Sequence, residues 1–201
     1  MNGFIGKALP LGPEDVGTVA EKIGVEEAAL RAVLSVETNG KGFDKSNRPK
    51  ALFERHVFYR LLKNKPDTLN LALNAGLAYK DWGTKPYPLT SDGVYAEIEA
   101  AYEMAPSEAL QSTSWGLGQI MGENYKVIGY DAPETMVQDA MDSEINQLRQ
   151  MAKFIKANGL VAPLVEKNWA AFAKRYNGPG YAQNKYDVKL AEAYQRWATE
   201  A

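Results

Sequence analysis

The 201-residue sequence contains no cysteine and only one histidine, His56. Without cysteine the chain cannot form a disulfide framework or a thiolate metal site, and a single histidine cannot build a multi-histidine site. We therefore expect chemistry that needs no metal ion and no cofactor. A fold without cysteine is also independent of the redox state around it, which suits a protein that works outside the cytoplasm.

Long apolar runs and a strong net charge are absent as well. No uninterrupted apolar stretch is long enough to span a bilayer, and the N-terminus lacks the basic and apolar segments of a signal peptide. The formal net charge is −2, which argues against general nucleic-acid binding. The sequence thus predicts a protein made in the cytoplasm, without stable membrane insertion and without a nucleic-acid partner.

The charges are nevertheless unevenly distributed along the chain. Residues 41–65 are mostly basic, whereas residues 92–144 are strongly acidic. A solvated face is the simplest interpretation of the basic segment, and the alternative is a surface that attracts an anionic polymer. The sequence leaves both interpretations open.

The length and composition suit one globular domain over residues 1–201. The apolar share is 45%, and no linker-like or low-complexity segment divides the chain. Apolar spacing and helix start and stop signals predict a mainly α fold with at most a small sheet. Residues 51–63 fit either a strand followed by a helix or a helix throughout, and the loop at 82–94 could line a cleft. Helices are expected at about residues 14–23, 26–38, 95–104, 116–128, 143–157, 162–176 and 185–198.

One carboxylate stands out in the segment LRAVLSVETNGKGF, residues 30–43. At about 100° per residue, Glu37 falls on the same side of the predicted helix as Leu30 and Leu34, and therefore points inward. Burial and the negative end of the helix dipole both disfavour its charged form and raise its pKa. An acid that stays protonated near neutral pH can donate a proton during glycosidic bond cleavage. The alternative is a helix-end glutamate bonded to a neighbouring lysine or arginine.

Two further segments carry a specific resemblance. STSWGLGQIMG at residues 112–122 and YNGPGY at residues 176–181 follow the buried helix in that order. Together with the helix that ends in glutamate, they make the chain resemble the lysozyme-like superfamily, especially soluble lytic transglycosylases and goose-type lysozymes. With PKALFERHVFYR at residues 49–60 included, the chain is most similar to the N-acetylmuramidase family of phage endolysins.

The resemblance implies a lysozyme-like helical bundle around the buried helix, with Glu37 as the general acid. The implied partner is the glycan strand of peptidoglycan, cleaved by a monomer without a cofactor. Such an enzyme reaches the cell wall after the inner membrane has been permeabilised. Trp115 is the aromatic residue that we expect to stack on a sugar. The other residues expected to line the sugar cleft are Ser114, Gly116, Leu117, Gln119, Ile120, Tyr176 and Asn177.

A second catalytic group is less clearly marked in the sequence. Glu54 in the segment LFERH and Asp44 after the glycine loop are the nearby carboxylates, and we prefer Glu54. For each of them, a structural ion pair with a neighbouring basic residue is the alternative. We assign His56 to packing, because a lone histidine on an apolar face is more often a packing residue than a catalyst.

The sequence leaves three functions open. The preferred one is hydrolysis of the β-1,4 bond between N-acetylmuramic acid and N-acetylglucosamine. A lytic transglycosylase would instead use the C6 hydroxyl of the muramic acid and leave a 1,6-anhydro end. The third is a peptidoglycan-binding module without turnover, although such a module gains nothing from an inward-facing acid that costs stability.

Overall fold

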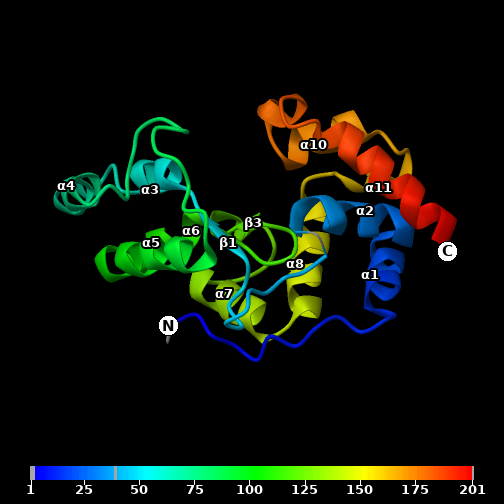
Figure 1. The fold of residues 1–201 in the computed structure, drawn as a ribbon, viewed down its shortest axis with the longest axis horizontal. Coiled ribbons are helices and arrows are strands. Elements are labelled where there is room, and N and C mark those ends of the chain that lie inside the picture. The colour runs from blue at the N-terminus through cyan, green and yellow to red at the C-terminus, as the bar shows by residue number, and fades with distance from the viewer. Residues whose placement is uncertain (1–2, 39, 201) are drawn as a thin grey trace.

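A computed structural model describes residues 3–38 and 40–200, and within these ranges the fold is mainly helical with one small sheet (Figure 1). This confirms the expected fold class. The elements follow each other in the order α1 (Asp15–Ile23), α2 (Glu27–Thr38), β1 (Ala51–Phe53), α3 (Arg55–Leu61), α4 (Pro66–Asn74), α5 (Ser91–Met104), α6 (Pro106–Gln111), β2 (Thr113–Trp115), β3 (Ile120–Met121), the short 3-10 helix η1 (Gly122–Asn124), α7 (Pro133–Asp142), α8 (Glu144–Ala157), α9 (Val161–Val165), α10 (Trp169–Tyr176), the 3-10 helix η2 (Pro179–Ala182) and α11 (Tyr186–Glu200).

The sheet lies near the middle of the molecule, between two groups of helices. Its three strands are antiparallel in the order β1-β2-β3, and Leu52 of β1 pairs with Ser114 of β2. In Figure 1, α3, α4 and α5 lie on the left, while α1, α2, α10 and α11 lie on the right and α8 runs between the two groups. The sheet therefore brings the segment that follows α2 against the segment at residues 112–122.

Helix α2 is buried over most of its surface. Ala29, Leu30, Ala32 and Val33 are 0% exposed, because α11 and α1 pack against this helix. Burial of apolar surface stabilises such an arrangement by about 25 cal/mol per Å². This packing fixes the position of the residues at the C-terminal end of α2, among them Glu37.

Helices α1, α2, α8 and α11 match the helices expected from the sequence. Gly24 ends α1 with a φ of 74°, a left-handed conformation that glycine adopts readily. Ser143 caps the start of α8, where its side chain accepts a hydrogen bond from the backbone N–H of Asn146. Residues 51–63 form a strand followed by a helix, which decides between the two alternatives.

The prediction of a helix at residues 116–128 is wrong. These residues form the β2–β3 turn, strand β3 and η1. Gly116 and Gln119 have φ angles of 67° and 47°, and such positive values interrupt a right-handed helix. The turn folds the chain back on itself, so that Trp115 pairs with Ile120.

The helix expected at residues 162–176 is divided into α9 and α10. Lys167 has a φ of 54° between them, and Asn168 caps the start of α10.

Helices α4, α6 and α7 have no counterpart among the expected helices. Proline is favoured in a first helical turn because its missing N–H would have no partner there. Each of these three helices begins with such a proline, namely Pro66, Pro106 and Pro133.

Candidate active site

A groove opens between the C-terminal end of α2 and the loop that precedes α5. Its volume is about 640 Å³, which lies within the range of ligand sites in proteins. The loop expected at 82–94 ends at Thr90, because α5 already begins at Ser91, and its residues Pro88, Leu89 and Thr90 line the groove together with Ser91. We call it the Glu37 groove. Its polar lining includes Glu37, Asp44, Lys50, Ser91 and Gln119.

Glu37 lies in the last turn of α2, at the wall of the groove. Part of its side chain is open to the groove, while protein surrounds the carboxyl group on the other sides. This burial raises the pKa of Glu37 to about 7. A hydrogen bond opposes the rise, since Nδ2 of Asn177 donates to Oε1 of Glu37 at 2.7 Å. No cation among residues 3–38 and 40–200 pairs with this carboxylate, so both of its protonation states are populated near neutral pH.

The third motif meets the groove at the C-terminal end of α10. Asn177 contacts Glu37 directly, but the neighbouring Tyr176 does not bond to it. The Tyr176 hydroxyl donates to the carbonyl oxygen of Gly118 at 2.7 Å, and its ring stacks on Phe172 with centroids 5.1 Å apart. Burial raises the pKa of Tyr176 well above its ordinary value, so the hydroxyl stays protonated. Tyr176 thus joins the third motif to the second.

Gln119 is the residue of the second motif that lines the Glu37 groove. Its amide oxygen accepts a hydrogen bond from Oγ of Ser114 at 2.9 Å. Its amide nitrogen donates to the carbonyl oxygens of Gly116 at 2.9 Å and Lys50 at 3.2 Å. These bonds hold the side chain in one orientation, and they stabilise a left-handed backbone that is uncommon for a residue with a side chain.

Gly116 is required by the packing of the turn. Its φ is 67°, and a Cβ atom at this position would lie 2.5 Å from Cδ of Gln147. Gln147 is itself only 1% exposed, and its Oε1 accepts a hydrogen bond from the backbone N–H of Leu117 at 2.9 Å. The glycine therefore allows a buried glutamine to approach the backbone of the motif.

Three of the residues expected to line the sugar cleft belong to the core instead. Trp115, Leu117 and Ile120 are 1%, 0% and 3% exposed. The indole N–H of Trp115 donates to the carbonyl oxygen of Leu110 at 3.1 Å, and its ring stacks on Phe4 with centroids 5.6 Å apart. The expectation that Trp115 stacks on a sugar is wrong, because both ring faces are covered by protein.

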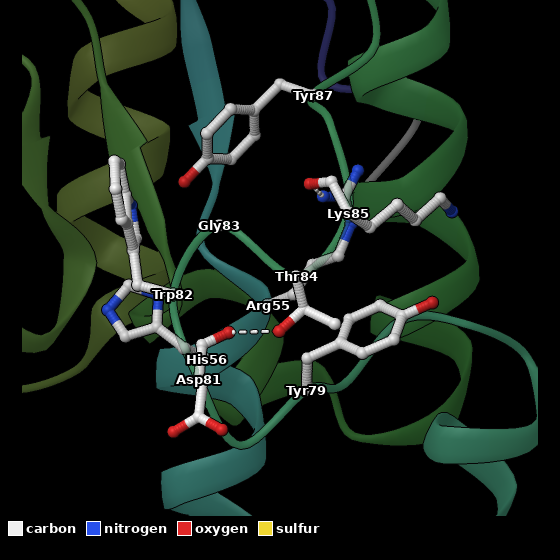
Figure 2. Close-up of a pocket in the computed structure, with 9 residues that line it drawn as sticks. All are labelled: Arg55, His56, Tyr79, Asp81, Trp82, Gly83, Thr84, Lys85 and Tyr87. Carbon is white, nitrogen blue, oxygen red and sulfur yellow. Dashed lines mark hydrogen bonds between the residues drawn. The ribbon is translucent and has the colours of Figure 1, made fainter.

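Glu54 does not line the Glu37 groove. Its carboxylate accepts a hydrogen bond from the Tyr87 hydroxyl at 2.6 Å and lies 3.3 Å from Nδ1 of His56. Tyr87 and His56 belong to a small neighbouring pocket, shown in Figure 2, whose volume of about 10 Å³ suits a single water molecule. These contacts fit a structural role for Glu54, in which it connects the start of α3 to the loop before α5.

Asp44 is the second carboxylate in the lining of the Glu37 groove. Its Oδ1 accepts from the backbone N–H groups of Ser46 and Arg48, at 2.8 and 3.0 Å. Its Oδ2 accepts from Nε of Arg48 at 2.8 Å and from the Ser91 hydroxyl. Although burial acts in the opposite direction, the bonds from Ser91 and Arg48 hold the pKa of Asp44 below its ordinary value. The structure thus favours Asp44 over Glu54 as the second acid of the groove.

Lys50 is a groove residue that the sequence does not distinguish. Its Nζ donates to the carbonyl oxygen of Thr38 at 2.7 Å, at the negative end of the α2 dipole. Burial lowers its pKa, and nearby Lys41 acts in the same direction. In the sequence Lys50 is one basic residue among many in the segment 41–65, and only its contact with the end of α2 singles it out.

Two other features of the described ranges bear on the site. Within residues 3–38 and 40–200, no helix combines the length and apolar character needed to cross a bilayer. No group of three or more histidine, aspartate and glutamate side chains in these ranges has the arrangement of a metal site.

Comparisons with known proteins agree with this geometry. Residues 26–198 match the model of the Muramidase family, described as N-acetylmuramidase. The chain belongs to the N-acetylmuramidase family. A crystal structure of Burkholderia AP3 phage endolysin is similar to this chain with a TM-score of 0.82 and 37% sequence identity, over 94% of this chain and 71% of that chain. No curated protein matches the chain.

The muramidase is a glycoside hydrolase that acts on the peptidoglycan of the bacterial cell wall. The matched range includes α2 with Glu37, the segment at residues 112–122 and the whole YNGPGY motif at residues 176–181, which begins at the end of α10. Hydrolysis is therefore favoured over transglycosylation and over binding without turnover.

Proposed function

We propose that Glu37 is the general acid with which the muramidase protonates the glycosidic oxygen between N-acetylmuramic acid and N-acetylglucosamine. The observation that carries this proposal is a carboxyl group with a pKa of about 7 on the wall of a 640 Å³ groove. Such a group is protonated in a large part of the population at neutral pH, and it is still acidic enough to give up its proton as the C–O bond breaks. The leaving alcohol therefore departs without a negative charge.

Asn177 supports the state that Glu37 enters when it loses its proton. A hydrogen bond to a carboxylate is stronger than one to the neutral acid, so the donor Nδ2 at 2.7 Å stabilises the product of proton transfer. The carboxylate of Glu37 can then accept a proton from the water that attacks the anomeric carbon of the muramic acid. We therefore assign Asn177 to the positioning of Glu37 rather than to sugar binding.

Asp44 supplies a second negative charge to the groove. The transition state of glycoside hydrolysis resembles an oxocarbenium ion, and an ionised carboxylate stabilises its positive charge. Asp44 is a poor nucleophile, because both of its oxygens already accept hydrogen bonds from Ser46, Arg48 and Ser91. We propose that Asp44 acts through its charge and that water attacks without a covalent intermediate on this residue.

The glycan strand would lie along the polar lining of the groove. Gln119 presents a fixed amide to it, and Lys50 and Ser91 add a cation and a hydroxyl group. These groups match the N-acetyl, hydroxyl and carboxylate groups of the substrate.

We also propose that residues 1–201 act as one domain and as a monomer. One hydrophobic core that extends from Val16 of α1 to Leu190 of α11 supports the single domain, and light scattering coupled to gel filtration tests the monomer.

Mass spectrometry of the soluble fragments released from purified peptidoglycan tests the chemistry, with Glu37→Gln as the matched variant. Glutamine has almost the shape of protonated glutamate but cannot serve as the acid. We expect reducing N-acetylmuramic acid ends from the wild type and none from the variant. Release by the variant at the wild-type rate would overturn the assignment of Glu37, and 1,6-anhydro ends would show transglycosylation instead of hydrolysis.

A further inference from the structure

A second groove lies between α1 and α8, which pack against each other to the right of centre in Figure 1. Its volume is about 650 Å³, similar to that of the Glu37 groove, and the two grooves share no lining residue. One face of α1 and one face of α8 form its walls. We call it the α1–α8 groove, and the proposed catalytic mechanism makes no use of it.

Cations without acidic partners line the α1–α8 groove. All of them are exposed, and none forms an ion pair with a residue in the described part of the chain. Arg149 donates to Oδ1 of Asn146 at 3.2 Å, and Nζ of Lys153 lies 4.8 Å from the ring centroid of Tyr130. These contacts leave the positive charges available to a ligand. The cations are Lys22, Arg149, Lys153 and Lys156.

The basic segment at residues 41–65 differs from this groove. Its three arginines and one of its lysines form ion pairs with the acidic segment at residues 92–144, so the two oppositely charged stretches of the sequence partly pair with each other. The α1–α8 groove instead gathers four cations without ion pairs in one lining, and they come from α1 and α8, which are far apart in the sequence. The neutralised pairs are Arg48–Asp92, Arg55–Glu97, Arg60–Glu123 and Lys65–Glu108.

The rest of the lining indicates which kind of anion fits. Val19 and Ile23 form an apolar floor, with 5% and 9% exposure, and Asn146 adds an amide. Asp15 and Asp139 also line the groove. These aspartates would repel a dense polyphosphate, whereas they can attract an amine. A peptide that carries carboxylates, methyl groups, amides and an amine therefore matches every part of the lining.

The spacing of the cations on α8 also suits a peptide. Arg149 and Lys156 are separated by two helical turns, a rise of about 10 Å. An extended peptide covers this distance in about three residues, at roughly 3.3–3.6 Å per residue. Two carboxylates a few residues apart on a peptide can thus reach both ends of the row at the same time.

We propose that the α1–α8 groove binds the acidic peptide stems of peptidoglycan. The stems would hold the muramidase on the wall while the glycan occupies the Glu37 groove, and this second contact raises the effective concentration of the substrate. The proposal rests on peptidoglycan as the substrate. It assigns to the catalytic domain a wall-binding surface that is separate from its cleft.

The test compares two variants that each remove three positive charges. The first, called the α8 variant, is Arg149→Gln/Lys153→Gln/Lys156→Gln, which removes the row of three positive charges on α8. The matched control is Lys45→Gln/Lys63→Gln/Lys80→Gln, at exposed lysines outside both grooves. Each enzyme is assayed on intact peptidoglycan and on glycan strands whose peptides have been removed by an amidase. On intact peptidoglycan we expect the α8 variant to raise KM about tenfold without changing kcat. On stripped glycan we expect all three proteins to be equal.

Other results would overturn the proposal. An equal KM for the α8 variant, the control and the wild type on intact peptidoglycan would show that the row does not contact the wall. An equal rise of KM on stripped glycan would assign the cations to the glycan rather than to the peptides. Absence of reducing N-acetylmuramic acid ends when the wild type acts on intact peptidoglycan would instead count against the function proposed for the Glu37 groove.

Direct binding separates the peptide from other anions. Isothermal titration calorimetry is carried out with the peptide stems released by the amidase and, separately, with inorganic polyphosphate. We expect the stems to bind to the wild type and to the control variant but not to the α8 variant. Stronger binding of polyphosphate than of the stems would contradict the peptide assignment.

Discussion

Two walls of the Glu37 groove hold carboxylates in opposite electrostatic environments. Asp44 lies beside Arg48, whose guanidinium pairs with it at 2.7 Å, and its pKa is below the ordinary value. Glu37 ends a buried helix, with an amide as its hydrogen-bond partner, and its pKa rises to about 7. At neutral pH one acid is ionised and the other can still donate a proton. The environment, rather than the residue type, thus divides the roles between them.

The largest effect should come from the acid without a cation. We expect Glu37→Gln to lower kcat by about 10²- to 10⁴-fold, because glutamine cannot protonate the leaving oxygen. Loss of turbidity of a peptidoglycan suspension measures the rate. Glu54→Gln is the control, since Glu54 lies outside the groove lining, and we expect less than a tenfold loss. A comparable loss in both variants would move the catalytic acid away from this groove.

Unpairing the other acid should mainly affect stability. Arg48→Met leaves Asp44 without its cation, and both side chains are largely buried, with 12% and 9% exposure. We expect a loss of about 2–4 kcal/mol in the free energy of unfolding, because a buried charge without a partner is strongly destabilising. Urea denaturation measures it.

A double variant separates the unpaired charge from simple loss of packing. In Asp44→Asn/Arg48→Met the charge that would be left alone is removed as well, so we expect part of the lost stability to return. Arg149→Gln, at an exposed arginine without an ion pair, should change the free energy of unfolding by less than about 0.5 kcal/mol. If Arg48→Met is equally mild, Arg48 does not stabilise the ionised form of Asp44.

The raised pKa of Glu37 predicts a pH-dependent cost in stability. Its folded-state pKa of about 7 lies above the ordinary value of 4.5, so the folded state binds this proton more tightly than the unfolded state. The wild type therefore gains stability as the pH falls from about 7 towards 4.5, and above pH 7 it keeps a buried charge. We expect Glu37→Gln to be more stable than the wild type by about 1–3 kcal/mol at pH 8.

This gain should disappear at acidic pH. At pH 5 the folded wild type already carries a protonated Glu37, so we expect the difference between the two proteins to fall below about 1 kcal/mol. Urea denaturation at both pH values gives the comparison. An equal stability difference at pH 5 and pH 8 would show that the substitution acts through packing and not through the charge.

The sequence predicts the wall of the groove that holds Glu37 better than the wall that holds Asp44. The position of Glu37 follows from local periodicity, because apolar residues on one side of a single helix determine which way it points. The environment of Asp44 depends on the hydrogen bond from Ser91, which lies 47 positions further along the chain, and on the loop that brings the two residues together. Local patterns contain no information about such a contact. For this reason the sequence alone favours Glu54 over Asp44 as the second catalytic group.

The second motif shows the same limit at the level of the fold. Its glycines and glutamine are correctly recognised as special, but the expected helix is a turn with positive φ angles at Gly116 and Gln119. Which residues of a tight turn face inward depends on what packs behind it. Here Phe4 and Gln147 cover Trp115 and Gly116, and Gln119 alone reaches the groove lining.

The smallest effect concerns the hydrogen bond from Asn177, which limits the rise in the pKa of Glu37. Asn177→Leu keeps a similar volume and removes the donor that lowers the pKa of Glu37, so burial acts without opposition. We expect the alkaline limb of the kcat/KM profile, where activity falls as Glu37 loses its proton, to move to higher pH. Tyr176→Phe is the control, because its hydroxyl bonds to Gly118 and not to Glu37. A limb that does not move, or that moves equally in both variants, would mean that Asn177 does not tune the acid, and the contrast with Asp44 would then rest on burial alone. A limb that moves to lower pH would mean that Asn177 stabilises the protonated acid instead of the carboxylate.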